Sequence, residues 1–101
     1  MLLFVVSSGD AVDLRAAVEL AAAARQRRID VSFFFMDRGV AGASRAGVCA
    51  QLSDMGCDMV ACASSAEQLG VAATALPEVV LGSQDDHAAL VHRAHRVVAF
   101  T

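Results

Sequence analysis

Lysine, tryptophan and tyrosine are absent from the sequence, so all eight basic residues are arginine. Without lysine the chain cannot form a Schiff base or the usual lysine-containing phosphate loop, and a receiver-type phosphorelay would lack its cation. Without tryptophan and tyrosine, a stacked flavin or a base-stacking RNA surface would depend on the five phenylalanines. The net charge of -3 also argues against a nucleic-acid surface. We therefore expect no bound cofactor and no nucleic-acid partner.

Long hydrophobic runs are missing as well, although 56% of the 101 residues are hydrophobic and the mean hydropathy is +0.54. The apolar stretches at residues 2–6, 21–24 and 33–36 fall far short of the roughly 20 residues that cross a bilayer. The first residues carry no basic segment, which predicts a strand rather than a signal peptide, and we expect no membrane partner. Because a chain this small has a limited interior, we expect the excess apolar surface to be buried between subunits of a homo-oligomer.

The three cysteines are an odd number and form no Cys-x-x-Cys motif, which disfavours a disulfide framework and thioredoxin-type chemistry. The sequence predicts Cys57 and Cys62 at opposite ends of one short strand, about 16 Å apart. A disulfide requires Cα atoms within about 7 Å, so these two residues cannot form one. We therefore expect a cytoplasmic protein with free thiols.

Short apolar runs alternate with helix-like segments along the whole chain, which is typical of a parallel sheet covered by helices. Strands are predicted at residues 2–6, 31–36, 58–61, 78–81 and 95–100, and helices at 11–28, 44–55, 64–70 and 84–93. Asp10 is the predicted cap of the first helix, and Gly56 and Gly70 end the second and third. The sequence thus predicts one α/β domain over residues 1–101, with three layers and a five-stranded, mostly parallel sheet.

Ligands of such sheets bind beyond the carboxyl ends of the strands. Four loops lie there, and their candidate binding residues are Ser7, Ser8, Gly9, Asp37, Gly39, Ser64, Ser65, Gly82 and Ser83. The segment 37–42 is expected to be a turn. The triplet 33–35, by contrast, is expected to be core.

Of the three cysteines, only Cys62 falls at the carboxyl end of a predicted strand and just before a helix. That position favours a thiolate, because unpaired backbone N–H groups and the helix dipole stabilise the anion. Cys62 is therefore the candidate catalytic residue. We interpret Cys49 and Cys57 as small buried hydrophobic residues.

Two other groups of residues admit a functional interpretation. Ser7-Ser8-Gly9 could cradle a phosphate, but the Asp10 carboxylate occupies the cap that an anion would use, so a plain capped turn is favoured. His87, His92 and His95 lie near Asp85 and Asp86 and form the one metal-like cluster in the sequence. We interpret it as a solvated helix end and expect no metal.

Three segments in order resemble the DsrE/DsrF-like family of small sulfur-transfer proteins. They are Ala17–Val40, with its Phe33-Phe34-Phe35-Met36-Asp37-Arg38-Gly39-Val40 strand and turn; Gly56–Val71, in which Cys62 falls on the family's conserved cysteine before a Ser-Ala pair; and Leu81–Phe100. The resemblance covers nearly the whole chain. It departs from the family at one place, because only residues 41–43 separate Val40 from the predicted second helix, which indicates a shortened loop over the site.

The resemblance implies a three-layer α/β domain that assembles as a homo-oligomer, a dimer, trimer or hexamer. It also implies that Cys62 carries sulfane sulfur as a persulfide between donor and acceptor proteins. The main alternative is a non-catalytic interaction or small-ligand-binding module of the same fold, in which Cys62 is structural. A flavodoxin-like cofactor protein is a third, weaker interpretation.

Overall fold

The computed structural model describes residues 1–101 and contains one five-stranded sheet. The strands are β1 (Leu2–Val6), β2 (Val31–Phe35), β3 (Asp58–Cys62), β4 (Val80–Gly82) and β5 (Arg96–Phe100). The helices are α1 (Ala11–Gln26), α2 (Arg38–Ala43), α3 (Val48–Asp54), α4 (Ala63–Leu69) and α5 (Gln84–Arg93), with a 3-10 turn at Ala73–Ala75. All neighbouring strands pair in parallel, in the order β4-β3-β2-β1-β5, which confirms the predicted fold class.

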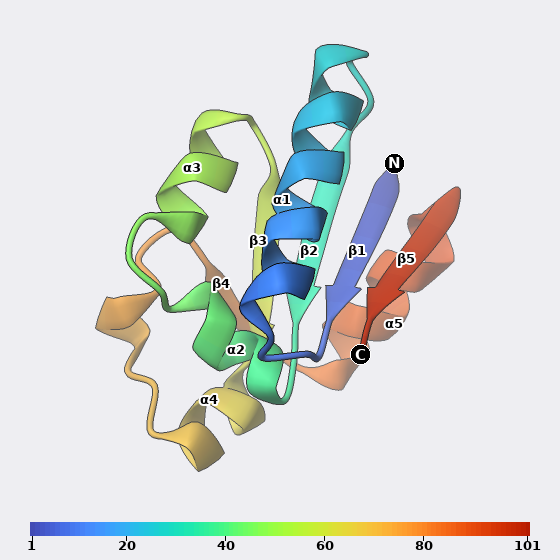
Figure 1. The fold of residues 1–101 in the computed structure, drawn as a ribbon. Coiled ribbons are helices and arrows are strands. Elements are labelled where there is room, and N and C mark those ends of the chain that lie inside the picture. Colours follow the sequence, from blue (N-terminus) through green and yellow to red (C-terminus); the bar gives the residue numbers. More distant parts are fainter.

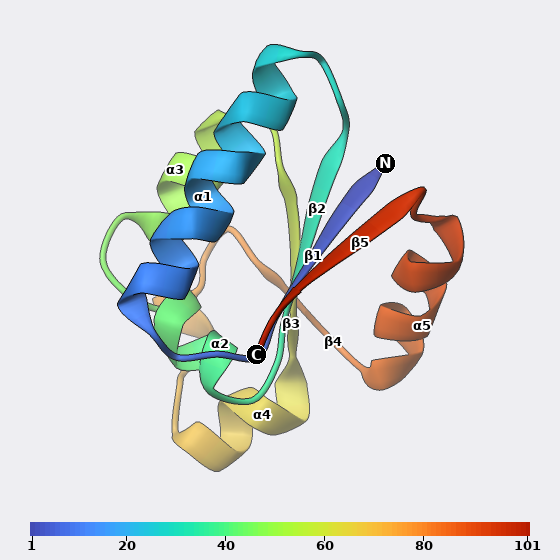
Figure 2. The same cartoon turned by 45° about the vertical axis from the view of Figure 1, so that its right-hand side comes forward.

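The helices form two unequal layers on the sheet (Figures 1 and 2). Helices α1, α2 and α3 cover one face, α5 alone crosses the other, and α4 lies at the carboxyl edge of the strands. The hydrophobic cluster on the face covered by α1, α2 and α3 contains 18 buried residues. The cluster on the opposite face, which includes Leu90 of α5, contains four. None of the helices combines the length and apolar character needed to cross a bilayer.

The predicted helix ends are confirmed where a local signal marks them. The Asp10 carboxylate accepts a hydrogen bond from the backbone N–H of Val12 at 2.7 Å, so it caps α1. Gly56 and Gly70 follow α3 and α4 with φ of +85° and +69°, a backbone conformation that glycine adopts without steric cost. Each of these signals depends on residues within one turn of the helix end, so tertiary packing does not change where the helix begins or ends.

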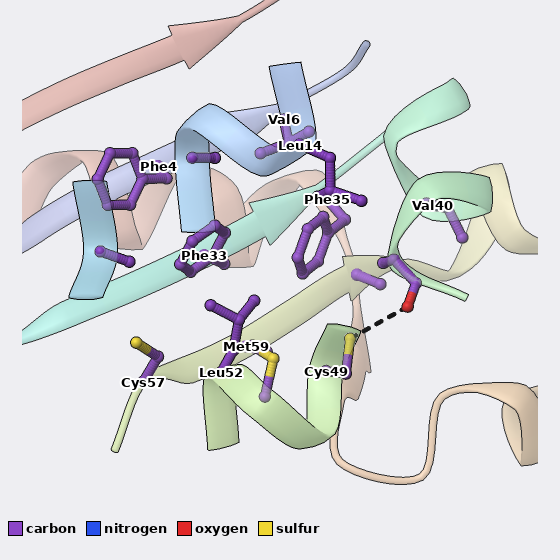
Figure 3. Close-up of a cluster of buried hydrophobic side chains, with 14 of the residues drawn as sticks. Phe4, Val6, Leu14, Phe33, Phe35, Val40, Cys49, Leu52, Cys57 and Met59 are labelled. Carbon is purple, nitrogen blue, oxygen red and sulfur yellow. Dashed lines mark hydrogen bonds between the residues drawn. The ribbon is translucent and has the colours of Figure 1, made fainter. Parts of the chain in front are cut away.

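Strand β2 lies at the centre of the sheet and is buried at every position, as predicted for Phe33, Phe34 and Phe35. Because successive strand residues point to opposite faces, Phe33 and Phe35 pack beneath α1 and α3 (Figure 3). Phe34 belongs to the smaller cluster on the α5 face, together with Leu3 and Cys62. The triplet thus anchors both layers of helices.

Residues 37–42 were expected to be a turn, and this expectation is wrong, because α2 occupies Arg38–Ala43. The two glycines in the segment suggested a helix breaker, yet both serve tertiary packing. A Cβ at Gly39 would overlap the carbonyl oxygen of Val6, so only glycine lets α2 lie against the end of β1. Gly42 faces Leu14 of α1 at ordinary contact distance. Packing thus overrides the low helix propensity of glycine here.

The predicted helix over 44–55 is also shorter than expected, because α3 begins at Val48 after Gly47 with φ of +84°. The expected shortened loop after Val40 is therefore replaced by the end of α2 and a connection to α3. Other differences are small: β4 covers Val80–Gly82 rather than 78–81, and α1 ends at Gln26.

We predict opposite effects on stability for alanine at the two glycines of α2. Gly39→Ala forces the backbone of α2 away from Val6 and should lower the free energy of unfolding by about 1–3 kcal/mol. Gly42→Ala meets only ordinary contact with Leu14, so it should leave stability unchanged or raise it by about 0.5–1 kcal/mol. Urea unfolding of both variants measures the difference, and equal stabilities would contradict the packing role assigned to Gly39.

Candidate functional site

Strand β3 passes directly into α4, and Cys62 stands at the junction. It is the last residue of β3 and the residue that precedes the first turn of α4, with an extended backbone (φ -65°, ψ 116°). The first turn of α4 therefore brings the backbone N–H groups of Ser64 and Ser65 close to the Cys62 side chain. The structure thus unites three of the predicted site residues at the carboxyl edge of the sheet.

Ser65 connects this junction to the end of β2. Its buried hydroxyl accepts a hydrogen bond from the backbone N–H of Asp37 at 2.9 Å. Asp37 has φ of +50°, a conformation uncommon for residues other than glycine. Because the lone pairs of the hydroxyl receive the Asp37 N–H, its own proton remains available for the sulfur of Cys62. Asp37 therefore contributes to the site through its backbone.

The donors around Cys62 favour the thiolate. The Ser65 hydroxyl is the strongest influence and lowers the pKa of the Cys62 thiol below its ordinary value, although burial opposes this change. The backbone N–H of Ser65, the side chain of Gln84 and the backbone N–H of Ser64 lower the pKa further.

The other two cysteines have the opposite character. Burial, aided by the charge of Glu78, raises the pKa of Cys49 to about 11. Burial also raises the pKa of Cys57, although the nearby Arg25 works against the change. The sulfur of Cys49 donates a hydrogen bond to the carbonyl oxygen of Ala43 inside the large cluster (Figure 3). Both residues are core side chains, as predicted.

Cys49, Cys57 and Cys62 are 5%, 6% and 5% exposed, so burial does not distinguish them. The groups that surround each sulfur do distinguish the three cysteines. Cys49 and Cys57 belong to the large hydrophobic cluster, whereas polar groups of Ser64, Ser65 and Gln84 lower the pKa of Cys62. Hydrogen-bonding groups, and not exposure, therefore distinguish Cys62 from the other two thiols.

Gln84 and His87 reach the same site from α5, and the sequence reasoning assigned them no role in it. His87 was expected at a solvated helix end, but its half-buried ring stacks on Phe34 with a centroid distance of 4.7 Å. Its Nδ1 lies 3.0 Å from Oε1 of Gln84. The spacing of three residues from Gln84 to His87 and on to buried Leu90 is the sequence signal that could have revealed this inner face.

Gly82 and Ser83 have structural roles beside the cysteine. Gly82 pairs with Cys62 in the register of β4 and β3. A Cβ at Gly82 would lie 2.5 Å from Oδ2 of Asp86 and 2.9 Å from Cγ1 of Val60, so a side chain there would displace the Asp86 carboxylate from the capping box. The Ser83 hydroxyl accepts the N–H of Asp85, and its own N–H donates to Asp86, which completes a capping box on α5.

Ser7, Ser8 and Gly9 lie apart from Cys62, because β1 is two strands away from β3, roughly 10 Å across the sheet. Their polar groups are used locally. Ser7 donates to the carbonyl of Phe100 at 3.4 Å, and Ser8 donates to the Asp13 carboxylate at 2.7 Å. These residues line a separate surface hollow with Arg38, so the structure does not bring them to the cysteine.

The histidine cluster does not assemble. Helix α5 ends at Arg93, so His95 lies beyond it and cannot share a helical face with His92. No group of three or more histidine, cysteine or acidic side chains is arranged to hold a metal ion.

The sequence profile of the DsrE/DsrF-like family matches residues 1–100. The chain belongs to the DsrE/DsrF-like family. Its fold is similar to that of the YchN protein from E. coli, with a TM-score of 0.84 at 18% identity over 98% of this chain and 97% of that one. A conserved protein of unknown function from Bacteroides thetaiotaomicron is also similar, with a TM-score of 0.76 at 14% identity over 98% and 94% of the chains. No curated protein sequence matches this DsrE-like chain.

In this DsrE-like protein we predict that Ser65→Ala makes Cys62 less reactive. Loss of the hydroxyl removes the strongest influence that lowers the thiol pKa, so the pKa should rise and the alkylation of Cys62 near neutral pH should slow by about tenfold or more. The variant should also lose about 1–3 kcal/mol of stability, because the Asp37 N–H loses its acceptor. Alkylation followed by peptide mass spectrometry over a range of pH measures the change.

Ser64→Ala is the matched control, because Ser64 acts on Cys62 through its backbone N–H, which alanine retains. Its alkylation profile should equal that of the unmodified protein. If the two serine variants gave the same profile, the hydroxyl of Ser65 would not be the group that activates Cys62.

Proposed function

We propose that this protein carries sulfane sulfur as a persulfide on Cys62, between a donor protein and an acceptor protein. The observation that supports the proposal most is the set of donors around the Cys62 sulfur, which lowers the pKa of its thiol in an otherwise apolar site. Membership of the DsrE/DsrF-like family supports a role of the same type. Cys49 and Cys57, with raised pKa values, have no part in the proposed chemistry.

In the loading step the Cys62 thiolate attacks the outer sulfur of a donor persulfide, R–S–SH. A new S–S bond forms to Cys62 as the S–S bond of the donor breaks. The donor leaves as the thiolate R–S⁻, and Cys62 becomes Cys62–S–SH, so atoms and charge balance. The transferred sulfur keeps its oxidation level, and the step needs no further oxidant or reductant. A lowered thiol pKa raises the fraction of Cys62 that can attack.

The unloading step uses the same property in reverse. A thiolate of the acceptor attacks the outer sulfur of Cys62–S–SH, forms its own persulfide and releases the Cys62 thiolate. A thiol of low pKa is the better leaving group, so the donors that activate Cys62 for loading also help it release the sulfur. Ser65 and the N–H groups of α4 thus serve both steps.

We predict that incubation with a persulfide donor adds the mass of one sulfur atom to the Cys62 peptide. Cys62→Ser should lose the adduct completely, because the hydroxyl is not a nucleophile for sulfane sulfur under these conditions. Cys57→Ala is the control and should retain it, since Cys57 is buried at the opposite end of β3. Mass spectrometry of the intact protein and its peptides reads both outcomes, and an adduct on Cys57 instead would contradict the assignment.

A non-catalytic interaction module is the second candidate, and one observation favours it. Cys62 is only 5% exposed and packs with Leu3, Phe34 and Leu90, as a structural cysteine would. On this alternative Cys62→Ser would lower stability, and the folded parent protein would acquire no sulfur adduct from any persulfide donor. The same mass-spectrometric experiment therefore separates the two functions.

We further propose that the protein is a cytoplasmic homo-oligomer. Strand β5 is an edge strand in which three of five positions are exposed, including Val97 at 45%. An open, apolar sheet edge of this kind is a ready site for association. A second copy of the chain accounts for the apolar excess of the sequence without any other partner.

Val97→Glu should therefore reduce the oligomer to a smaller species, because it places a charge on the proposed contact. Val12→Glu is the matched control away from both sheet edges, in the first turn of α1, where Val12 is 73% exposed. It should leave the mass unchanged. Size-exclusion chromatography with light scattering measures both, and a monomeric parent protein would contradict the assembly.

A further inference from the structure

A hollow lies beside the amino-terminal half of β3, next to the face of the sheet that α5 alone covers (Figure 2). Strand β4 begins only at Val80, which pairs with Val60, so Asp58 and Met59 have a neighbouring strand on one side alone. The hollow beside them has a volume of about 400 Å³ and is closed on one side by residues of α5. This volume is in the range typical of small-molecule sites.

Ser32 contributes a buried hydroxyl to the wall of this hollow. It pairs with Asp58 in the register of β2 and β3, and the residue is only 6% exposed. Ser32 also lines the adjoining hollow beside Asp30. No side-chain hydrogen bond of the protein involves the Ser32 hydroxyl. Because a buried hydroxyl without a partner is costly, we expect its partner to be a group held in the hollow.

Charges of both signs line the hollow and do not neutralise one another. Asp58 and Glu78 supply carboxylates, and Arg93 supplies a guanidinium from the last turn of α5. The one ion pair of the protein joins Arg25 to Asp30, so Arg93 pairs with neither carboxylate. Opposite charges that share a hollow without pairing leave room for a ligand that carries both charges.

Much of the remaining wall is apolar. Val60, Val80 and Leu90 line the hollow from β3, β4 and α5. Leu90 is buried in the smaller hydrophobic cluster, and Val60 packs against that cluster. An apolar wall with a few convergent polar groups is the usual composition of a site for a small molecule.

We propose that this hollow binds a small zwitterion with an apolar side chain, which is the chemistry of a free apolar amino acid. Arg93 binds the carboxylate, because a guanidinium can donate two parallel hydrogen bonds to it. Asp58 and Glu78 bind the ammonium group, the Ser32 hydroxyl bonds to the same polar end, and the apolar wall covers the side chain. The site goes beyond the sulfur chemistry proposed for Cys62, which lies at the other end of β3.

The test uses L-leucine as the probe and follows the backbone amide resonances of the protein by NMR. Leucine should cause saturable shifts of the amides of Ser32, Asp58 and Arg93. Isoamylamine lacks the carboxylate of leucine, and isocaproate lacks its ammonium group. Each should bind about tenfold more weakly or worse, as expected for the loss of hydrogen bonds between charged groups. Equal binding of either analogue, or the absence of saturable shifts with leucine, would overturn the proposal.

Variants of the lining residues locate the binding. Arg93→Met and Asp58→Asn each remove a charge at an exposed position, so both should fold and should weaken leucine binding by about tenfold or more. Ser32→Ala should weaken it by about threefold to tenfold, the effect of one hydrogen bond of ordinary strength. Arg27→Met is the matched control, because Arg27 is an exposed arginine at the end of α1, and it should bind leucine as the parent protein does. Unchanged binding in both charge variants would place leucine elsewhere and reject the site.

Discussion

The hydrogen bond from the backbone N–H of Asp37 to the hydroxyl of Ser65 connects the fold to the chemistry of the site. It joins the end of β2 to the first turn of α4, and its donor, Asp37, has a positive φ of +50° just before α2. The position of α2 depends in turn on Gly39, which lies against the carbonyl of Val6. Because the Asp37 N–H fills one acceptor position of the Ser65 hydroxyl, the proton of that hydroxyl is free for Cys62. Gly39, Asp37 and Ser65 therefore all contribute to the surroundings of the Cys62 sulfur at the carboxyl edge of the sheet.

Most of the fold could be predicted from the sequence because its signals are local. Five apolar runs correspond to five parallel strands, and Asp10, Gly56 and Gly70 end or begin helices for reasons confined to their own turns. Cys62 was placed correctly at the junction of a strand and a helix, since parallel strands gather their carboxyl ends at one edge. The strand order could not be derived, because it depends on which crossovers the packing of the helices permits.

The errors share one cause, which is contact between residues distant in the sequence. The glycines of α2 indicated a turn, but the contacts that require them are with Val6 and Leu14 on other elements. The inward position of His87 depends on Phe34 of β2, and nothing within α5 except the spacing to Leu90 indicates it. The candidate site could therefore be predicted for the residues that β3 and α4 supply, and it was incomplete for those that arrive from α5.

The unequal layers of the protein reconcile the burial of Cys62 with the sulfur transfer proposed for it. Cys62 lies on the face that α5 alone covers, where the hydrophobic cluster has four buried residues against 18 on the opposite face. Local opening is favoured where few apolar contacts must be broken. The amino-terminal turn of α5, which carries the exposed Gln84, can therefore move at a lower cost than α1 or α3. On the function proposed above, a donor that displaced this turn would reach the sulfur while the core beneath the other face stayed packed. Cys49 and Cys57, equally buried but inside the larger cluster, have no such route, so the asymmetry of the two layers selects the same cysteine as the hydrogen-bond donors do.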